Sequence, residues 1–283
     1  MTYDKFKNKK SFEDNGFFIA ENIYTHEDME DVFYTFYDIC LSFINKNNIK
    51  NSFPDTQEVS YPDDMKLLDN LVISILNHDR EILGEVYDTF SYSLSFFRFI
   101  SNKKIQSIVQ ELLSQASKSS LYGWTNRMRI DPPGDTRRTY GWHQEVFYTL
   151  PESRFIQTWC PMLRDTSVSN GTIFIKKGSH KEGIPQQTWT DIPGKATQIL
   201  INDDITSKYE TLQIEMRIGE VLCFDGHLAH KSGNNTTSDE VRFSLVGMWH
   251  NISAKGFRGP KPNFELRSIS PKDYFSKYMD QRS

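Results

Sequence analysis

Metal-binding residue types stand at two separate places in this chain. The triplet His143-Gln144-Glu145 brings an imidazole and a carboxylate two residues apart, and residues 224–230 offer two further histidines, His227 and His230. Two imidazoles and one carboxylate on one ion leave several coordination positions open, which is the arrangement that non-haem Fe(II) oxygenases use. A single His-x-Glu triplet is more often a surface pair, so the prediction depends on what accompanies it.

Arg242 accompanies these residues in an otherwise apolar run, residues 241–249. An arginine in that setting is buried against a partner carboxylate, exposed at a strand end, or placed to bind a ligand carboxylate through two parallel charge-assisted bonds. A dicarboxylate co-substrate such as 2-oxoglutarate needs a cation of this kind. Taken together, the residues predict an Fe(II)- and 2-oxoglutarate-dependent oxygenase. Strand parity adds Ser244, which shares a face with Arg242, to the predicted co-substrate pocket.

The geometry of the metal ligands follows from the same periodicity. On an extended strand His143 and Glu145 point to the same side, as two neighbouring ligands of one ion should. The third ligand must come from another strand. Parity does not choose between His227 and His230, because Gly226 can interrupt the strand that carries them.

The chain changes pattern near residue 120, and this change indicates what positions the site. Before it, apolar residues recur at helical spacing through residues 29–44, 65–76 and 105–113, and residues 25–28 resemble a capping box. After it, short runs rich in β-branched and aromatic residues occupy 121–130, 155–163, 171–176, 196–202, 212–218, 220–225 and 241–249. Many short strands without helices between them favour a sandwich or a jelly roll.

We therefore expect a mainly β protein with flanking helices. Its core is predicted to be a jelly roll of the cupin-like, double-stranded β-helix type, covered by an N-terminal helical layer. No linker-like stretch divides the two parts, so residues 1–283 are predicted to form a single oxygenase domain. Within it, residues 1–118 form the mostly helical outer layer, residues 119–255 the jelly-roll core, and residues 256–283 a C-terminal wrap.

Composition excludes several other classes of protein. The net charge of -4 gives no basic face for nucleic acid. No apolar run approaches the roughly 18 residues that a membrane span needs, and residues 1–18 lack the apolar region of a secretory signal. Three widely separated cysteines argue against a disulfide framework, and Cys160 and Cys223 are expected to be buried. These features predict a cytoplasmic enzyme that binds neither nucleic acid nor membrane.

A series of segments, in order along most of the chain, resembles the phytanoyl-CoA dioxygenase family of Fe(II)/2-oxoglutarate oxygenases. Residues 12–22 are similar to its opening strand, and residues 128–133 lead into 142–148, which resemble its metal strand. Residues 159–162 and 170–180 resemble its Trp strand and its Gly-Ser-His turn. Residues 230–235, His-Lys-Ser-Gly-Asn-Asn, match its His-x-Ser-x-x-Asn segment, with an arginine at the expected distance. The whole series is far more specific than any one motif.

The resemblance implies a role for each matched residue. His143, Glu145 and His230 hold iron, which selects His230 over His227, and Arg242 binds the remote carboxylate of 2-oxoglutarate. The positions of Ser232, Trp159 and Met128 line the co-substrate pocket, although Trp159 is as easily explained as a core aromatic residue. The family usually has aspartate where this chain has Glu145. Related halogenases leave that position without a carboxylate, so the resemblance implies oxygenation and not halogenation.

The implied reaction is hydroxylation of an unactivated carbon in a small polar metabolite or biosynthetic intermediate, with succinate and CO2 as co-products. Oxygen is the second co-substrate, and ascorbate the expected reductant in vitro. Arg127 and Arg129 flank Met128 and offer positive charge to an anionic or hydroxyl-rich substrate, although such a charge cluster is more often simply solvated. Two alternatives are an inactive jelly-roll binding or scaffold protein and a cupin-type zinc isomerase or hydrolase, which has no use for Arg242.

Overall fold

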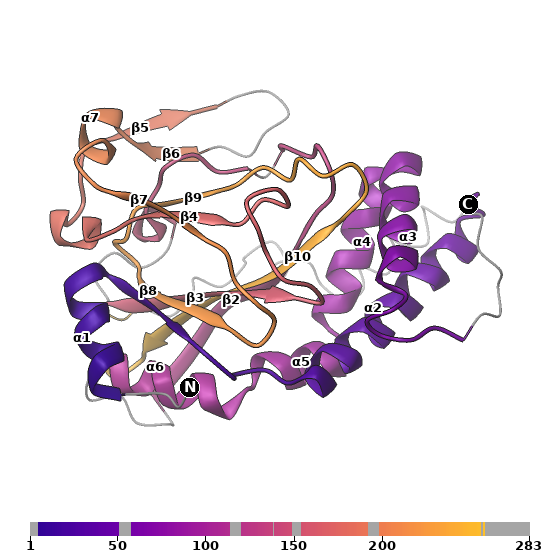
Figure 1. Cartoon of the computed structure of the whole chain (residues 1–283), viewed down its shortest axis with the longest axis horizontal. Coiled ribbons are helices and arrows are strands. Elements are labelled where there is room, and N and C mark those ends of the chain that lie inside the picture. Colours follow the sequence, from indigo (N-terminus) through magenta and orange to yellow (C-terminus); the bar gives the residue numbers. More distant parts are fainter. Residues whose placement is uncertain are drawn as a thin grey trace, which may run out of the picture.

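The N-terminal part of the chain forms a layer of helices. The computed structural model describes residues 5–50, 58–113, 120–137, 139–148, 154–191, 198–255 and 257. Its first part contains helices α1 (Lys5–Asn15), α2 (His26–Lys46), α3 (Met65–His78), α4 (Arg80–Ser91), α5 (Leu94–Ile100) and α6 (Lys103–Leu112), with the short strand β1 (Phe17–Ala20) between the first two (Figure 1). The predicted capping box is confirmed, because Thr25 and Asp28 exchange hydrogen bonds at the start of α2.

A five-stranded antiparallel sheet forms the base of the β core. Its order is β1, β8 (Val221–Asp225), β3 (Phe155–Met162), β10 (Arg242–Asn251) and β2 (Leu121–Asp131). Strand β10 lies between β2 and β3 and pairs with both over most of its length. Its register with β2 shifts between Val246 and Met248, which is a β-bulge. Bulges bend a strand and redirect the neighbouring side chains.

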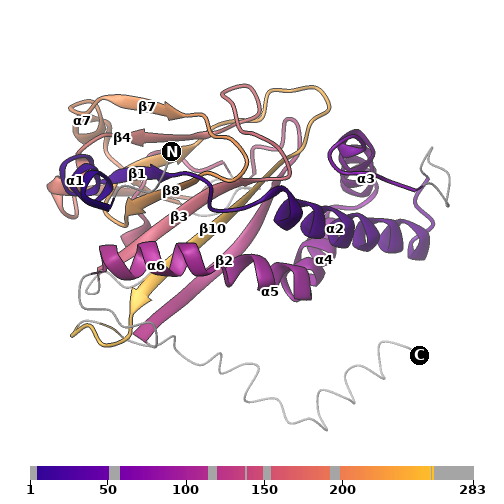
Figure 2. The ribbon, with the colours of Figure 1, turned by 60° about the horizontal axis from the view of Figure 1, so that its bottom comes forward.

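A second, three-stranded sheet covers one face of the first. It consists of β7 (Thr211–Ile214), β4 (Ile173–Lys176) and β9 (His230–Ser232), in that order. A hairpin of β5 (Gln187–Thr190) and β6 (Gln198–Ile201) and the short helix α7 (Asp203–Thr206) complete this side. Figure 2 shows α2, α5 and α6 along one face of the large sheet, with β4 and β7 on the other side. The jelly-roll core with its outer helical layer is confirmed.

Strands β3, β8 and β10 of the large sheet are buried on both faces, and the two faces differ. Residues at alternate positions pack beneath the helices, as where Phe36 of α2 meets Phe243 of β10 edge to face with ring centroids 5.7 Å apart. The intervening positions face the smaller sheet, where Trp159, Leu222 and Phe224 pack against residues of β4. This period of two separates a mostly apolar layer from the layer that carries the chemistry.

The segment that carries the first two metal ligands departs from the prediction. It does not lie on a regular strand. His143 makes an isolated β-bridge with His230, and Glu145 begins a 3-10 helix, Glu145–Phe147. The same-side argument from strand parity was therefore wrong, although the two side chains still converge. The predicted C-terminal wrap, residues 256–283, falls almost wholly outside the described residues.

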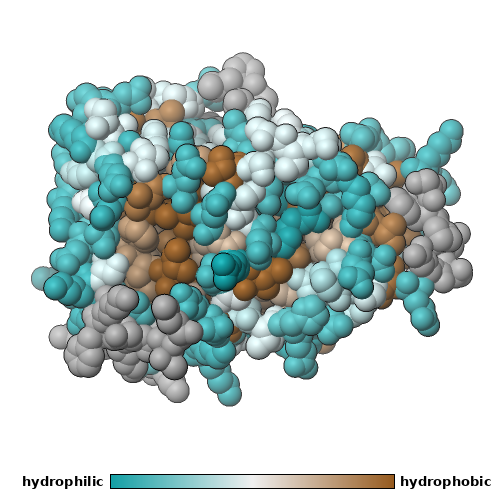
Figure 3. Space-filling view, in the orientation of Figure 1, coloured by the Kyte–Doolittle hydropathy of each residue, from teal (hydrophilic) through white to brown (hydrophobic). Residues whose placement is uncertain are grey.

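The surface is mixed in character. Figure 3 shows hydrophilic side chains around the edges of one face and hydrophobic side chains gathered toward its middle. Among the described residues, no helix combines the length and the apolar character that crossing a bilayer requires. Cys40, Cys160 and Cys223 are all buried and free, as predicted for the latter two.

Candidate functional site

Three side chains meet at the mouth between the two sheets. His143 and His230 come together through the β-bridge, in which each backbone N–H donates to the other residue's carbonyl at 3.0 Å. Their Nε2 atoms lie 3.9 and 3.7 Å from the same oxygen of Glu145, Oε2. Ligand atoms of the three residues all fall within 4.8 Å of one another. This separation suits a single ion placed between them.

The two imidazoles are oriented by their own backbones. Nδ1 of His143 lies 2.8 Å from the carbonyl of Gly141, and Nδ1 of His230 lies 2.9 Å from the carbonyl of Leu228. A carbonyl oxygen only accepts, so each Nδ1 carries the proton and each Nε2 presents its lone pair toward the centre. Burial, together with the neighbouring His230 ring, lowers the pKa of His143 to about 3. His143 is therefore neutral at physiological pH, as a metal ligand must be.

Glu145 is the anionic member of the group. Burial disfavours its charge, but the two histidines and Gln157 outweigh this effect and lower its pKa. Gln157 on β3 donates from Nε2 to Oε2 of Glu145 at 3.0 Å. The carboxylate is therefore ionised and held in place before any metal binds.

A second cluster of charge lies beside the metal-binding group. Arg242 donates to Oδ2 of Asp131 at 2.6 Å, and Arg129 donates to Oδ1 of the same carboxylate at 3.0 Å. Burial disfavours the charge on Asp131, but the two guanidinium groups outweigh it and hold its pKa at about 2. Arg242 is thus paired with a protein carboxylate, one of the alternatives left open by the sequence. Its Nε is nevertheless buried without a hydrogen-bond partner.

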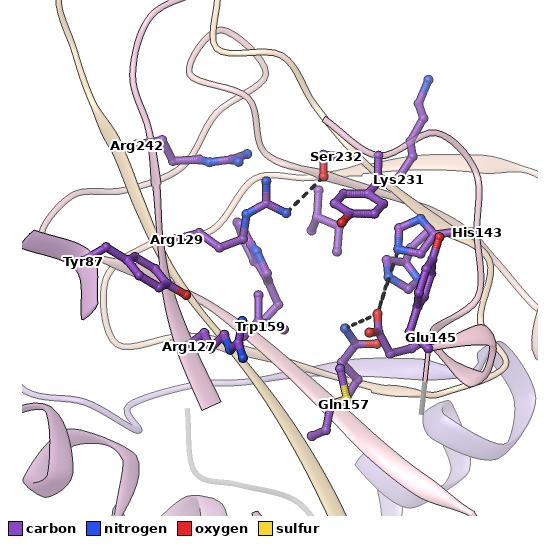
Figure 4. Close-up of a pocket in the computed structure, with 16 residues that line it drawn as sticks. Tyr87, Arg127, Arg129, His143, Glu145, Gln157, Trp159, Lys231, Ser232 and Arg242 are labelled. Carbon is purple, nitrogen blue, oxygen red and sulfur yellow. Dashed lines mark hydrogen bonds and ion pairs between the residues drawn. The ribbon is translucent and has the colours of Figure 1, made fainter. Parts of the chain in front are cut away.

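One pocket of about 460 Å³ joins these two clusters. Figure 4 shows the metal-binding residues on one side, Arg242, Arg129 and Ser232 on another, and Trp159 between them. Tyr140 and Tyr148 flank His143, with ring centroids 5.3 and 5.9 Å from its own. A pocket of this size suits a small molecule.

The structure brings together most of the residues predicted for the site. His143, Glu145, His230, Arg242, Ser232 and Trp159 all line this pocket. His227, the alternative third ligand, instead turns its Nδ1 to Asp225 at 3.0 Å and lies outside the metal-binding group. Trp159 also packs in the core between the sheets, so it is both a pocket residue and a core aromatic residue.

Two predicted residues lie outside the pocket lining. Met128 is fully buried in the core beneath the helices, because it alternates along β2 with Arg127 and Arg129, which face the pocket. Ser244 has the predicted parity and faces the same side as Arg242, but it is completely covered and its hydroxyl has no partner. In the register of β10 and β2 it lies opposite Arg129. The structure does not place either side chain at the pocket surface.

The sequence analysis did not identify several residues of the site. Gln157 lines the pocket, and as a polar residue within the apolar strand β3 it could have been noticed from the sequence. Asp131 does not line the pocket but pairs with Arg129 and Arg242, and its position two residues after Arg129 was a usable signal. Tyr87 comes from α4 in the helical layer, and nothing in the sequence connects it with the site.

The pocket's donor set fits iron and 2-oxoglutarate. Two imidazole nitrogens and one carboxylate oxygen would supply three ligands to an Fe(II) ion, and such a set leaves coordination positions for a co-substrate and oxygen. The Nε–H of Arg242 is a buried hydrogen-bond donor that has no acceptor within the described part of the protein. A carboxylate arriving from the pocket is the acceptor that such a donor suits best.

The jelly-roll sheets and the three-residue centre beside a buried arginine define the class, that of the non-haem Fe(II)/2-oxoglutarate oxygenases. The chain belongs to the phytanoyl-CoA dioxygenase (PhyH) family, whose pattern it matches over residues 12–244. Fe(II) and 2-oxoglutarate are the cofactor and co-substrate of that family.

Individual relatives agree with this assignment. The chain is 32% identical to the 1-deoxypentalenic acid 11-beta-hydroxylase of Streptomyces arenae over 141 residues, 48% of this chain and 50% of the hydroxylase. It is 24% identical to the phytanoyl-CoA dioxygenase of Arabidopsis thaliana over 77% of this chain and 71% of that one. The match to the hydroxylase thus spans only half of that enzyme's length.

The same fold occurs among solved structures. EvdO2 from Micromonospora carbonacea var. aurantiaca, complexed with 2-oxoglutarate, superposes with a TM-score of 0.57. The alignment covers 93% of this chain and 96% of that one at 16% identity. The likeness shows that the two chains share a fold.

Proposed function

We propose that this protein is an Fe(II)- and 2-oxoglutarate-dependent oxygenase that hydroxylates an unactivated carbon of a small polar metabolite or biosynthetic intermediate. The observation that carries the proposal is the convergence of His143, Glu145 and His230 on one side of a pocket whose other side holds Arg242. The pocket volume of about 460 Å³ supports a small substrate. The name of the Streptomyces relative, a hydroxylase of a small organic acid, is consistent with this class.

Each group of residues has a distinct role in the proposed reaction. His143, Glu145 and His230 hold the iron, and Arg242 binds the remote carboxylate of 2-oxoglutarate. When bound, iron and 2-oxoglutarate would supply the oxidising chemistry, in which the substrate, O2 and 2-oxoglutarate yield the hydroxylated product, succinate and CO2. The protein contributes orientation and shielding: the burial of His143 and His230 keeps bulk water from the ligands, and Gln157 fixes the carboxylate.

The test is succinate formation from 2-oxoglutarate by the purified protein with Fe(II) and ascorbate, in air and without oxygen. We expect oxygen-dependent succinate that is lost in His143→Ala and in Arg242→Ala. The binding of Fe(II) and of 2-oxoglutarate is measured in the same samples. A wild-type protein that binds neither would contradict the proposal, as would turnover that continues unchanged without oxygen.

A further inference from the structure

The pocket carries an excess of positive charge. Arg127, Arg129, Lys231 and Arg242 line it, and Glu145 is the one acidic residue among the described residues that do so. Asp131, just behind the pocket, offsets one more positive charge through its pairing with two of these arginines. Bound iron and 2-oxoglutarate carry opposite charges of equal size. Binding of both therefore leaves the net positive charge of the pocket unchanged, and this charge faces either another ligand or the solvent.

Two of the four cations already have roles. Arg242 and Arg129 share Asp131, and Arg129 lies 3.4 Å from the hydroxyl of Ser232. Both therefore belong to the part of the pocket assigned to the co-substrate.

Lys231 is occupied in a different way. Its ammonium group lies over the rings of Trp142 and Phe174, 5.0 and 5.1 Å from their centroids. Figure 4 shows its side chain directed away from the pocket. A cation stacked on two aromatic rings is stabilised where it is.

Arg127 has no such partner. Within the described part of the chain, the structure gives its guanidinium neither an ion pair nor a hydrogen bond, although the residue lines the pocket. Figure 4 places it toward Tyr87 and Gln157, apart from the group of Arg242 and Ser232. It lies opposite Val246, directly beside the bulge in the pairing of β2 and β10. Bulges next to active sites commonly redirect a side chain in this manner.

We infer that the primary substrate is a small carboxylic acid whose carboxylate binds Arg127. This inference rests on the proposed function, because it takes the rest of the pocket to hold iron and 2-oxoglutarate. One unpaired guanidinium matches one carboxylate, through two parallel charge-assisted bonds. A phosphate monoester carries more charge and more acceptor oxygens than this single group satisfies. With its carboxylate bound to Arg127, the rest of the substrate extends past Gln157 toward the metal-binding residues.

The inference can be tested with simple probes, without knowledge of the true substrate. The protein is loaded with Ni(II), which does not turn over, and with saturating 2-oxoglutarate. Binding of cyclohexanecarboxylate and benzoate is then compared by ligand-observed NMR with binding of the corresponding primary amides, which have the same shape without the charge. We expect the wild-type protein to prefer each acid over its amide by about tenfold, as a charge-assisted contact implies.

Variants of Arg127 test whether this residue causes the preference for acids over amides. In Arg127→Leu we expect acids and amides to bind equally, and in Arg127→Lys a reduced preference for the acids. Arg217→Leu is the matched control, because it removes an exposed arginine outside the pocket and should behave as the wild type does. Equal binding of acids and amides to the wild type, or an unchanged preference in Arg127→Leu, would overturn the inference.

Failure of the inference is distinguishable from failure of the proposed function. Ni(II) and 2-oxoglutarate binding are measured first, and their absence in the wild type would contradict the function itself. Arg127→Leu should retain both, together with the thermal unfolding midpoint of the wild type, because its side chain is exposed and unpaired. A change confined to the acid probes is therefore the expected signature.

Discussion

The side-chain amide of Gln157 donates a 3.0 Å hydrogen bond to Oε2 of Glu145, the same oxygen that faces Nε2 of both His143 and His230. The two residues come from different elements, because Gln157 lies on β3 and Glu145 begins a 3-10 helix. Glutamate has one more rotatable bond than the aspartate usual in the family. The hydrogen bond fixes this longer side chain in a geometry suited to one ion.

Gln157→Leu should therefore weaken metal binding. The substitution keeps the volume but removes the donor, so Glu145 loses its orientation and part of the stabilisation of its charge. Removing an outer partner of a metal ligand typically lowers affinity about 10- to 100-fold. Titration with Mn(II) or Co(II) measures the change, and Gln213→Leu on the exposed face of β7 is the control. Wild-type affinity in Gln157→Leu would refute this role.

Arg242→Leu should weaken 2-oxoglutarate binding at least a hundredfold and leave metal binding intact. Its guanidinium lies in the pocket away from the three ligands, with a buried Nε that lacks a partner. Losing a bidentate charge-assisted contact costs about 3 kcal/mol or more, which is at least a hundredfold in affinity. Calorimetry with the Ni(II)-loaded protein gives both constants, and Arg242→Lys should recover only part of the loss, because it lacks the planar fork. Weakened Ni(II) binding in either variant would show that the two clusters are coupled.

Asp131→Asn should destabilise the protein, because it leaves Arg129 and Arg242 buried without their shared anion. Breaking a buried ion pair by removing one partner costs about 3 to 5 kcal/mol in unfolding free energy. Chemical denaturation at neutral pH measures it.

The same pair predicts a pH dependence. The folded-state pKa of Asp131, about 2, lies below its ordinary value. Its contribution to stability is then fully present above about pH 4 and is lost as the pH falls toward 2. The difference in unfolding free energy between the wild type and Asp131→Asn should shrink across this window. A difference that stays constant from pH 7 to pH 2 would mean that the carboxylate is not ionised in the fold.

Gly171→Ala should disturb the segment that follows β9. Gly171 has φ of +91°, and an added Cβ would lie 2.8 Å from backbone atoms of Asn234 and Asn235. Gly178 is a matched control, because its φ is also positive, +81°, but nothing lies within 4 Å of an added Cβ. Both variants incur the backbone strain of about 1 kcal/mol, and only Gly171→Ala adds a clash of about 1 to 3 kcal/mol. Equal thermal unfolding midpoints would contradict this packing argument.

Local patterns in the sequence determined much of the fold. The capping box at Thr25 and Asp28, the apolar stripe of α2 and the apolar strand over residues 241–249 are set by neighbouring residues, and these three predictions are confirmed. Periodicity also placed Arg242 on the face of β10 that reaches the pocket. The short strands β5 and β9 were not predicted, because their pairing depends on distant partners and not on their own few residues.

The tertiary structure alone decided how the site is assembled. His143 meets His230 through a β-bridge between segments almost ninety residues apart in sequence, and no local rule predicts such a contact. The pairing of Asp131 with both Arg129 and Arg242 also depends on the tertiary structure. So does the position of Tyr87, which lines the pocket although it belongs to the helical layer. The sequence by itself determined which chemical groups are present and which way each strand faces. Packing of the two sheets determined which groups meet, because that depends on contacts summed over the whole chain.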